Sequence, residues 1–189
     1  MKLPLPDSEL DALVAKVVRR TLGEDGAAAG PARKVTIGSD HRGTELKQTL
    51  IELIERQGYD VIDCGAHPGT TAADYPDIAA AVAGPVGAGE AWRGIVIDGA
   101  GIGSSIAANK IRGVRAALCY NLATAVNSRE HNDANVLALG SGLTDPALAQ
   151  EIVTTWLKTP FGGGRHAKRV DKIMALESQR THGQAEGRS

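Results

Sequence analysis

Asp98 stands at the head of a glycine-rich turn, directly after the apolar run 94–97 and before an alanine-rich stretch typical of a helix. A strand, a glycine turn and a helix start in succession leave backbone N–H groups uncovered at the carboxyl end of the strand. A carboxylate beside such donors suits removal of a proton next to a carbonyl, because the carboxylate takes the proton while the donors hold the oxyanion. The turn therefore predicts an acid–base site with Asp98 as the base.

Further polar side chains follow other apolar segments. Asp40 and His41 come directly after the run 35–39, and a carboxylate with an imidazole can hydrogen-bond sugar hydroxyls. The alternative is that Asp40 caps a helix and His41 lies on the surface. His131, in the polar segment 128–133, is either a proton donor or an ordinary turn residue.

Several cations follow the glycine run 162–164, among them Arg165 and Arg169. The planar fork of arginine suits phosphate, although a solvated helix start would have the same composition. Taken together, the chain offers a base, an acid, oxyanion donors and a phosphate clamp, which is a coherent catalytic set.

The elements that position these residues alternate along the chain. Continuous apolar runs are typical of parallel strands buried on both faces, and the connections between them are right-handed crossovers. The pattern predicts a doubly wound α/β sandwich with a five-stranded parallel sheet, in which ligands bind at the carboxyl ends of the strands. We expect strands at 35–39, 61–64, 94–97, 114–119 and 136–140, and helices at 44–57, 75–86, 104–110, 123–129 and 145–158.

Composition excludes several classes of protein. A net charge of -1 and 3% aromatic residues give neither a basic field nor stacking rings for nucleic acid. No apolar stretch approaches the ~20 residues of a membrane span, and the start does not resemble a secretory signal, so we expect a cytoplasmic protein. Cys64 and Cys119 lack metal-ligand spacing, which argues against zinc and against a disulfide, and we expect both to be reduced core residues.

The N-terminal segment of the chain differs from the rest. Residues 7–22 repeat apolar side chains at helical spacing, and 23–31 form a glycine- and alanine-rich linker. We expect an N-terminal helix and linker over 1–33, a catalytic domain over 34–177 and a disordered polar tail over 178–189. The apolar face of the helix needs a surface, which is its own domain, a dimer mate or a separate docking partner.

Several motifs in a fixed order resemble the type B ribose-5-phosphate isomerases and the related galactose-6-phosphate isomerase subunits, over about residues 34–176. The resemblance implies a Rossmann-like three-layer α/β/α sandwich that forms a homodimer or a dimer of dimers, with the active site between two subunits. It implies an aldose–ketose isomerisation through a cis-enediolate without metal or cofactor, with ribose 5-phosphate and ribulose 5-phosphate as the first substrate pair. The motifs lie at 38–43, 74–76, 99–110, 128–140 and 164–169.

The same resemblance implies roles for individual positions. Asp40, His41 and Tyr75 would contact the sugar, and His131 would open the furanose ring. The backbone of the turn would cradle the reacting oxygens, Asn132 would bind a hydroxyl, and the arginine pair would hold the phosphate. The remaining substrate-binding positions are Gly99, Ala100, Gly101, Ile102, Gly103, Ser104, Arg165 and Arg169.

This chain departs from the family pattern within the turn and beside it. Asp98 replaces a cysteine base, Ser104 replaces a glutamate, and Ala100 replaces a hydroxyl residue. Burial can raise the pKa of a carboxyl by several units, so Asp98 is a workable base. Many members have a phosphate-binding arginine after the glycine that ends the fifth strand, whereas here Ser141 and Gly142 end that segment without one. Arg42 stands where small residues are common, so that Arg42 either compensates or selects a different sugar.

The N-terminal extension resembles the encapsulation peptides that direct enzymes into bacterial microcompartments. This likeness implies that residues 7–22 bind a microcompartment shell protein. Two other functions stay open from the sequence: an isomerase for another sugar phosphate, and a catalytically silent sugar-phosphate-binding or scaffold subunit.

Overall fold

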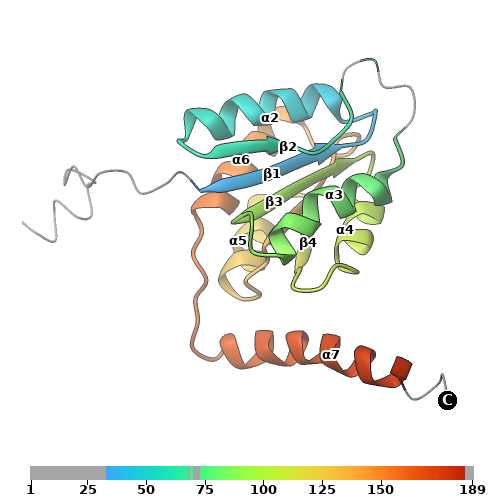
Figure 1. Ribbon diagram of the computed structural model, residues 1–189. Coiled ribbons are helices and arrows are strands. Elements are labelled where there is room, and N and C mark those ends of the chain that lie inside the picture. The colour runs from blue at the N-terminus through green and yellow to red at the C-terminus, as the bar shows by residue number, and fades with distance from the viewer. Residues whose placement is uncertain (1–32, 68, 70–72, 186–189) are drawn as a thin grey trace, which may run out of the picture. The chain divides into compact units, whose positions relative to one another are not determined.

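The computed structural model describes residues 33–67, 69 and 73–185, and it contains a parallel sheet of five strands in the order β2-β1-β3-β5-β4 (Figure 1). The predicted doubly wound α/β class is confirmed. The strands are β1 (Lys34–Ser39), β2 (Asp60–Asp63), β3 (Arg93–Asp98), β4 (Ala116–Leu118) and β5 (Val136–Gly140).

Helices cover both faces of the sheet and form two separate cores. Ile95 and Ile97 of β3 point into the core beneath α2 (Thr44–Arg56), α5 (Leu122–Glu130) and α6 (Pro146–Lys158). Val96 points into the core beneath α3 (Tyr75–Gly87) and α4 (Ile102–Ala108). Because β3 pairs with β1 and with β5 and is buried along its whole length, it is the rigid centre on which the loops are mounted.

The strand β2 differs from the expected pattern. The sequence predicts strands that are buried on both faces, yet most of β2 is exposed. The reason is its place in the sheet, since β2 pairs with β1 alone and forms an edge. Cys64, just after this edge, is half-buried and packs against the margin of the core beneath α3 and α4, whereas Cys119 is fully buried as expected; both are free.

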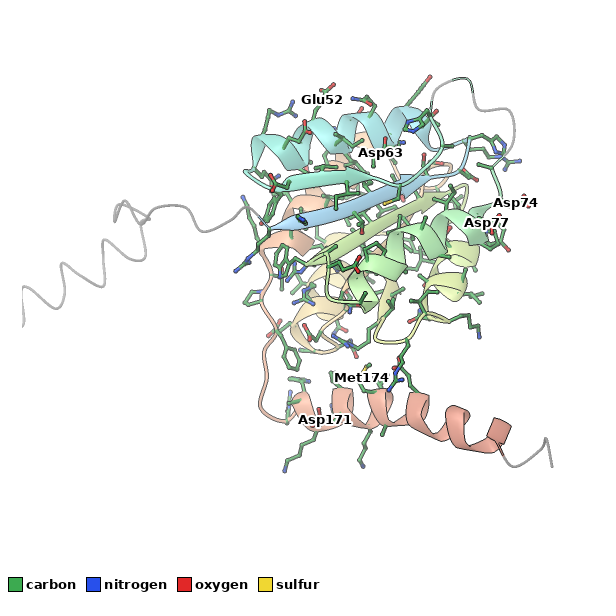
Figure 2. All side chains as sticks on the ribbon, in the orientation of Figure 1. Glu52, Asp63, Asp74, Asp77, Asp171 and Met174 are labelled. Atoms are coloured by element: carbon green, nitrogen blue, oxygen red, sulfur yellow. The ribbon has the colours of Figure 1, made fainter. Side chains whose placement is uncertain are left out.

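A last helix, α7 (Ala167–Ala185), was not among the predicted elements. The Gly113 N–H donates to the Glu177 carboxylate, and the Arg115 guanidinium contacts the Met174 sulfur, which Figure 2 shows on α7. The structure thus has helix from residue 178 to Ala185, where a disordered tail was expected.

Two expectations concern residues at the termini. Residues 1–32 of the helix and linker predicted over 1–33, and the last four residues of the tail, lie outside the described residues. Of the helices in the described part of the chain, none is long and apolar enough to cross a membrane.

Candidate active site

A cavity of about 750 Å³ opens at the carboxyl ends of β1 and β3. From β1 the chain passes to β2 on one side of the sheet, and β3 lies on the other side, so strand order reverses between these two strands. Such switch points are where ligands bind in open α/β sheets. Four segments line the cavity: 40–42 after β1, 73–75 at the start of α3, the turn after β3, and 141–143 after β5.

The loop after β1 is held by Asp40. Its Oδ1 accepts the backbone N–H groups of Arg42 at 2.9 Å and Gly43 at 3.2 Å. The N-cap position of α2 is Gly43, so Asp40 orders the loop and does not occupy the cap position itself. A Cβ on Gly43 would lie 2.8 Å from Cγ2 of Ile97, which keeps this loop pressed against β3. His41 and Arg42 are thereby directed toward the cavity.

Asp98 ends β3 and is only 5% exposed. Its Oδ1 accepts the N–H groups of Ala100, at 2.8 Å, and Gly101, and its Oδ2 accepts the N–H of Ser104 at 2.9 Å. The carboxylate therefore closes the turn on itself. Donors that the sequence assigned to a substrate oxyanion are occupied by the chain's own anion.

These hydrogen bonds decide the pKa of Asp98. Burial alone would raise it, but the Ser104 side chain and the backbone N–H groups of Ser104, Gly101 and Ala100 together outweigh burial. The pKa of Asp98 consequently lies below its ordinary value, in the direction opposite to the one that burial suggested from the sequence.

Glycines shape the turn where it meets its neighbours. Gly101 has φ 76°, and a Cβ there would lie 2.5 Å from Leu118 Cδ1. A Cβ on Gly103 would lie 2.5 Å from Cε2 of Tyr75, so the tyrosine ring rests directly on the turn. Tyr75 and Gly103 both line the cavity.

The predicted residues of the turn divide into two groups. Gly99, Ala100 and Gly103 line the cavity together with Asp98. Gly101, Ile102 and Ser104 do not; the side chain of Ile102 is exposed and Ser104 is fully buried.

A second set of predicted residues lies elsewhere on the chain. His131, Asn132, Arg165 and Arg169 are absent from the lining of the cavity. The His131 ring stacks on that of His166, with centroids 4.2 Å apart, and its Nδ1 lies 2.8 Å from Asn127 Nδ2. Within one chain, the predicted acid and phosphate clamp are therefore not brought to the predicted base.

Positive charge gathers around these stacked rings. The Arg165 Nε–H donates to His166 Nε2 at 3.4 Å. Partial desolvation, and then the charges of His131, Arg165 and Arg169, lower the pKa of His166. We call the side chains of His131, Arg165, His166 and Arg169 the cationic cluster. The positive charge of its arginines suits an anion such as phosphate.

Buried ion pairs that the sequence did not predict hold the surrounding loops. The Asp133 carboxylate joins Arg115 and Arg129, each at 2.9 Å, and so fixes the segment that carries His131. Lys47 is 1% exposed, and its Nζ lies 2.7 Å from both oxygens of Asp63. A lysine in an amphipathic helix is normally expected to face solvent, so the burial of Lys47 could not be predicted from the sequence.

Lys47 also donates to the Ala66 carbonyl at 2.7 Å. It thus anchors the segment that leaves β2 and leads toward Asp74 at the start of α3, and Figure 2 shows the positions of Asp63 and Asp74 on these elements. In the described ranges, no group of three or more His, Cys, Asp or Glu could hold a metal ion. Metal-free chemistry stays a prediction.

The part of the chain that is similar to known proteins is the sheet domain. Residues 35–173 match the family model described as Ribose/Galactose Isomerase. The chain is 44% identical to Ribose-5-phosphate isomerase B of Escherichia coli, covering 78% of this chain and 99% of that protein. It is 38% identical to D-erythrulose-4-phosphate isomerase of Pectobacterium atrosepticum, covering 78% and 97%. A solved Ribose-5-Phosphate Isomerase B of Clostridium thermocellum is similar with a TM-score of 0.75 and 52% identity, covering 78% and 99%.

Proposed function

Because the chain belongs to the ribose/galactose isomerase family, whose members act on sugar phosphates, we propose that it interconverts ribose 5-phosphate and ribulose 5-phosphate. The observation that carries this proposal is the cavity between β1 and β3. It collects Asp40, His41, Tyr75 and the head of the Asp98 turn, which the resemblance assigns to the sugar.

In the proposed reaction, Asp98 removes the proton from C2 of the open-chain aldose while the C1 carbonyl oxygen gains negative charge. The resulting cis-enediolate takes the proton back at C1, and a proton moves from O2 to O1, which gives the ketose. Oδ1 of Asp98 already accepts two N–H bonds and Oδ2 accepts one, so Oδ2 is the oxygen that takes the proton.

We assign the other half of the site to a second copy of the chain. His131 would then donate a proton in ring opening, Asn132 would bind a hydroxyl, and Arg165 with Arg169 would hold the phosphate. The separation of these residues from the cavity supports this arrangement, because a closed two-fold interface brings different parts of two chains together.

Exposed apolar side chains support the same homodimer. Ile102 and Ile106 of α4 are 51% and 58% exposed, and Leu176 of α7 is 58% exposed. Large apolar side chains on a helix surface are typical of a face that another surface covers. A dimer of dimers would need a further interface.

A four-carbon substrate is the second candidate. One relative is named for erythrulose 4-phosphate. In this chain Arg42, which stands where small residues are common in the family, lines the cavity. An additional guanidinium inside the cavity leaves less room for a long sugar.

The test is a panel of ribose 5-phosphate, galactose 6-phosphate and erythrose 4-phosphate, assayed by formation of the ketose. The proposal expects ribose 5-phosphate to have the highest kcat/KM. A higher kcat/KM for erythrose 4-phosphate would show that the substrate is the four-carbon sugar. No turnover of any sugar would favour a silent binding subunit.

We also propose that residues 7–22 dock on a microcompartment shell protein. The support is the amphipathic pattern and the linker in the sequence alone, since these residues lie outside the described ranges.

A further inference from the structure

The Asp98 carboxylate takes up part of the donor set of its own turn. The N–H groups of Ala100, Gly101 and Ser104 are bonded to it, and residue 100 is alanine and supplies no hydroxyl. Of the turn residues in the cavity lining, Gly99 and Gly103 keep N–H groups that are not bonded to Asp98. A cation beside these two groups would add to the stabilisation of negative charge that builds up during the reaction.

Arg42 supplies a cation at this place. A Cβ built on Gly99 would lie 3.4 Å from Arg42 Nη1 and 3.7 Å from Arg42 Cδ, so the side chain crosses the open face of Gly99. The backbone N–H of Arg42 is fixed by the Asp40 carboxylate, which aims the side chain from the β1 loop across to the β3 turn.

The charge balance of the cavity gives Arg42 further importance. The lining holds the acidic residues Asp40, Asp74 and Asp98, and Arg42 is the one arginine or lysine among the described residues that line it. In the described part of the chain the guanidinium forms no ion pair, so its N–H groups are available to a ligand.

We propose that the Arg42 guanidinium binds the developing enediolate oxygens during isomerisation and is therefore a catalytic residue. This inference rests on the proposed function. The Arg42 guanidinium lies over Gly99, the residue after the proposed base, and therefore at the reacting end of the substrate. A planar fork with two parallel N–H groups matches two neighbouring enediolate oxygens. The competing role is a ground-state contact to phosphate in place of the arginine absent from the segment that Ser141 and Gly142 end.

The two roles differ in which step they affect. A group that binds charge present only in the transition state changes kcat, whereas a phosphate contact, made before and during the reaction, changes KM. We therefore compare Arg42→Met and Arg42→Lys with the wild type. The matched control is Arg56→Met, since Arg56 is an exposed arginine of α2 whose partner is Glu52 and which does not line the cavity.

For Arg42→Met we expect kcat to fall by about 10²–10³-fold with KM changed less than about threefold, as for loss of an oxyanion donor. Arg42→Lys should recover part of the loss, and Arg56→Met should match the wild type. A loss expressed mainly in KM, or no loss, would overturn the proposal.

Binding measurements by calorimetry separate this inference from the proposed function. The probes are a phosphorylated hydroxamate, which mimics the enediolate, and a phosphorylated sugar alcohol, which carries the same phosphate without that planar oxygen pair. Arg42→Met should weaken hydroxamate binding at least tenfold and leave alcohol binding unchanged. Equal weakening of both would assign Arg42 to phosphate and overturn the inference. If the wild type turns over no sugar yet Arg42→Met still discriminates the two probes, the proposed function fails and the assignment of Arg42 to the planar oxygens stands. If the wild type binds neither probe, both are overturned.

Discussion

Asp98 holds the glycine turn together and is also the proposed base, and these two roles make opposite demands on its proton affinity. The N–H bonds that order the turn favour the ionised carboxylate and lower the pKa, which reduces its strength as a base. In return, the carboxylate is ionised and correctly placed before substrate arrives.

The first prediction concerns pH. Because the pKa of Asp98 lies below its ordinary value, the base stays ionised as the pH falls to about 4, the usual range of an aspartate. The loss of kcat/KM that belongs to this group should therefore occur below about pH 4. In Asp98→Cys, the corresponding loss should move up toward about pH 8.5, the ordinary pKa of a thiol. A profile that is the same in both proteins would exclude residue 98 as the base.

Alkylation gives a second readout for Asp98→Cys. Iodoacetamide should inactivate this variant, while the wild type serves as the control, because burial raises the pKa of both Cys64 and Cys119 and leaves little reactive thiolate.

The second prediction concerns stability. Asp98→Ala leaves the buried N–H groups of Gly101 and Ser104 without a partner, and one such group costs about 1–3 kcal/mol. A depressed folded pKa stabilises the protein above the unfolded pKa of about 4, and this contribution is lost as pH falls through the folded pKa. In urea unfolding, the difference in the free energy of unfolding between wild type and Asp98→Ala should thus be larger at pH 7 than at pH 3. Asp171→Ala, which changes an exposed residue of α7, should have the wild-type free energy of unfolding at both pH values.

At the scale of elements, Lys47 connects α2 to the end of β2. Lys47→Met removes a buried cation and leaves the Asp63 carboxylate and the Ala66 carbonyl without it. The Ala66 carbonyl then becomes a buried acceptor without this donor, and such a group costs about 1–3 kcal/mol, which is the expected fall in the free energy of urea unfolding. Arg56→Met breaks an exposed pair and should cost less than about 1 kcal/mol. Similar costs for both variants would contradict the anchoring role.

Most strands and helices of the sheet domain could be predicted because they have a clear apolar pattern. The predicted segment 136–140 is β5 itself, and α2 begins at Thr44 as predicted. Boundaries were less accurate in short elements: β4 covers only Ala116–Leu118, and α4 begins two residues before the predicted start. α7 was missed because its polar residues outweigh the apolar stripe that includes Val170 and Ile173.

The cavity residues could be predicted because they follow the carboxyl ends of parallel strands. The hydrogen bonds that lower the pKa of Asp98 could not be predicted. Burial indicates only the cost of desolvation, and the sequence does not show that the N–H groups of the turn bond to the carboxylate of the same turn. Nor does one sequence show that Arg42 reaches Gly99, because that contact joins loops that are far apart along the chain.

At the scale of the whole molecule, the proposed site needs two chains. Asp98→Asn and Arg165→Ala should each be nearly inactive alone. Refolding them together in equal amounts should give about a quarter of wild-type activity, because half of the dimers are mixed and each contains one intact site. Activity equal to the sum of the separate variants would mean that each chain carries its own complete site.

The N-terminal extension allows a test of independent function. Deleting residues 1–31 should leave kcat/KM and the dimeric state unchanged while abolishing sedimentation with shell protein. Loss of the dimer after deletion would show instead that the helix packs on its own enzyme.

Because the Asp98 carboxylate occupies N–H groups of its own turn, it determines where inorganic anions can bind to the protein. A glycine loop with open amides attracts sulfate or phosphate from any buffer, but here a carboxylate of the same chain already fills that place. Inorganic anions should therefore bind at cationic side chains, namely the cationic cluster and Arg42, and not at the three amides that the Asp98 carboxylate occupies.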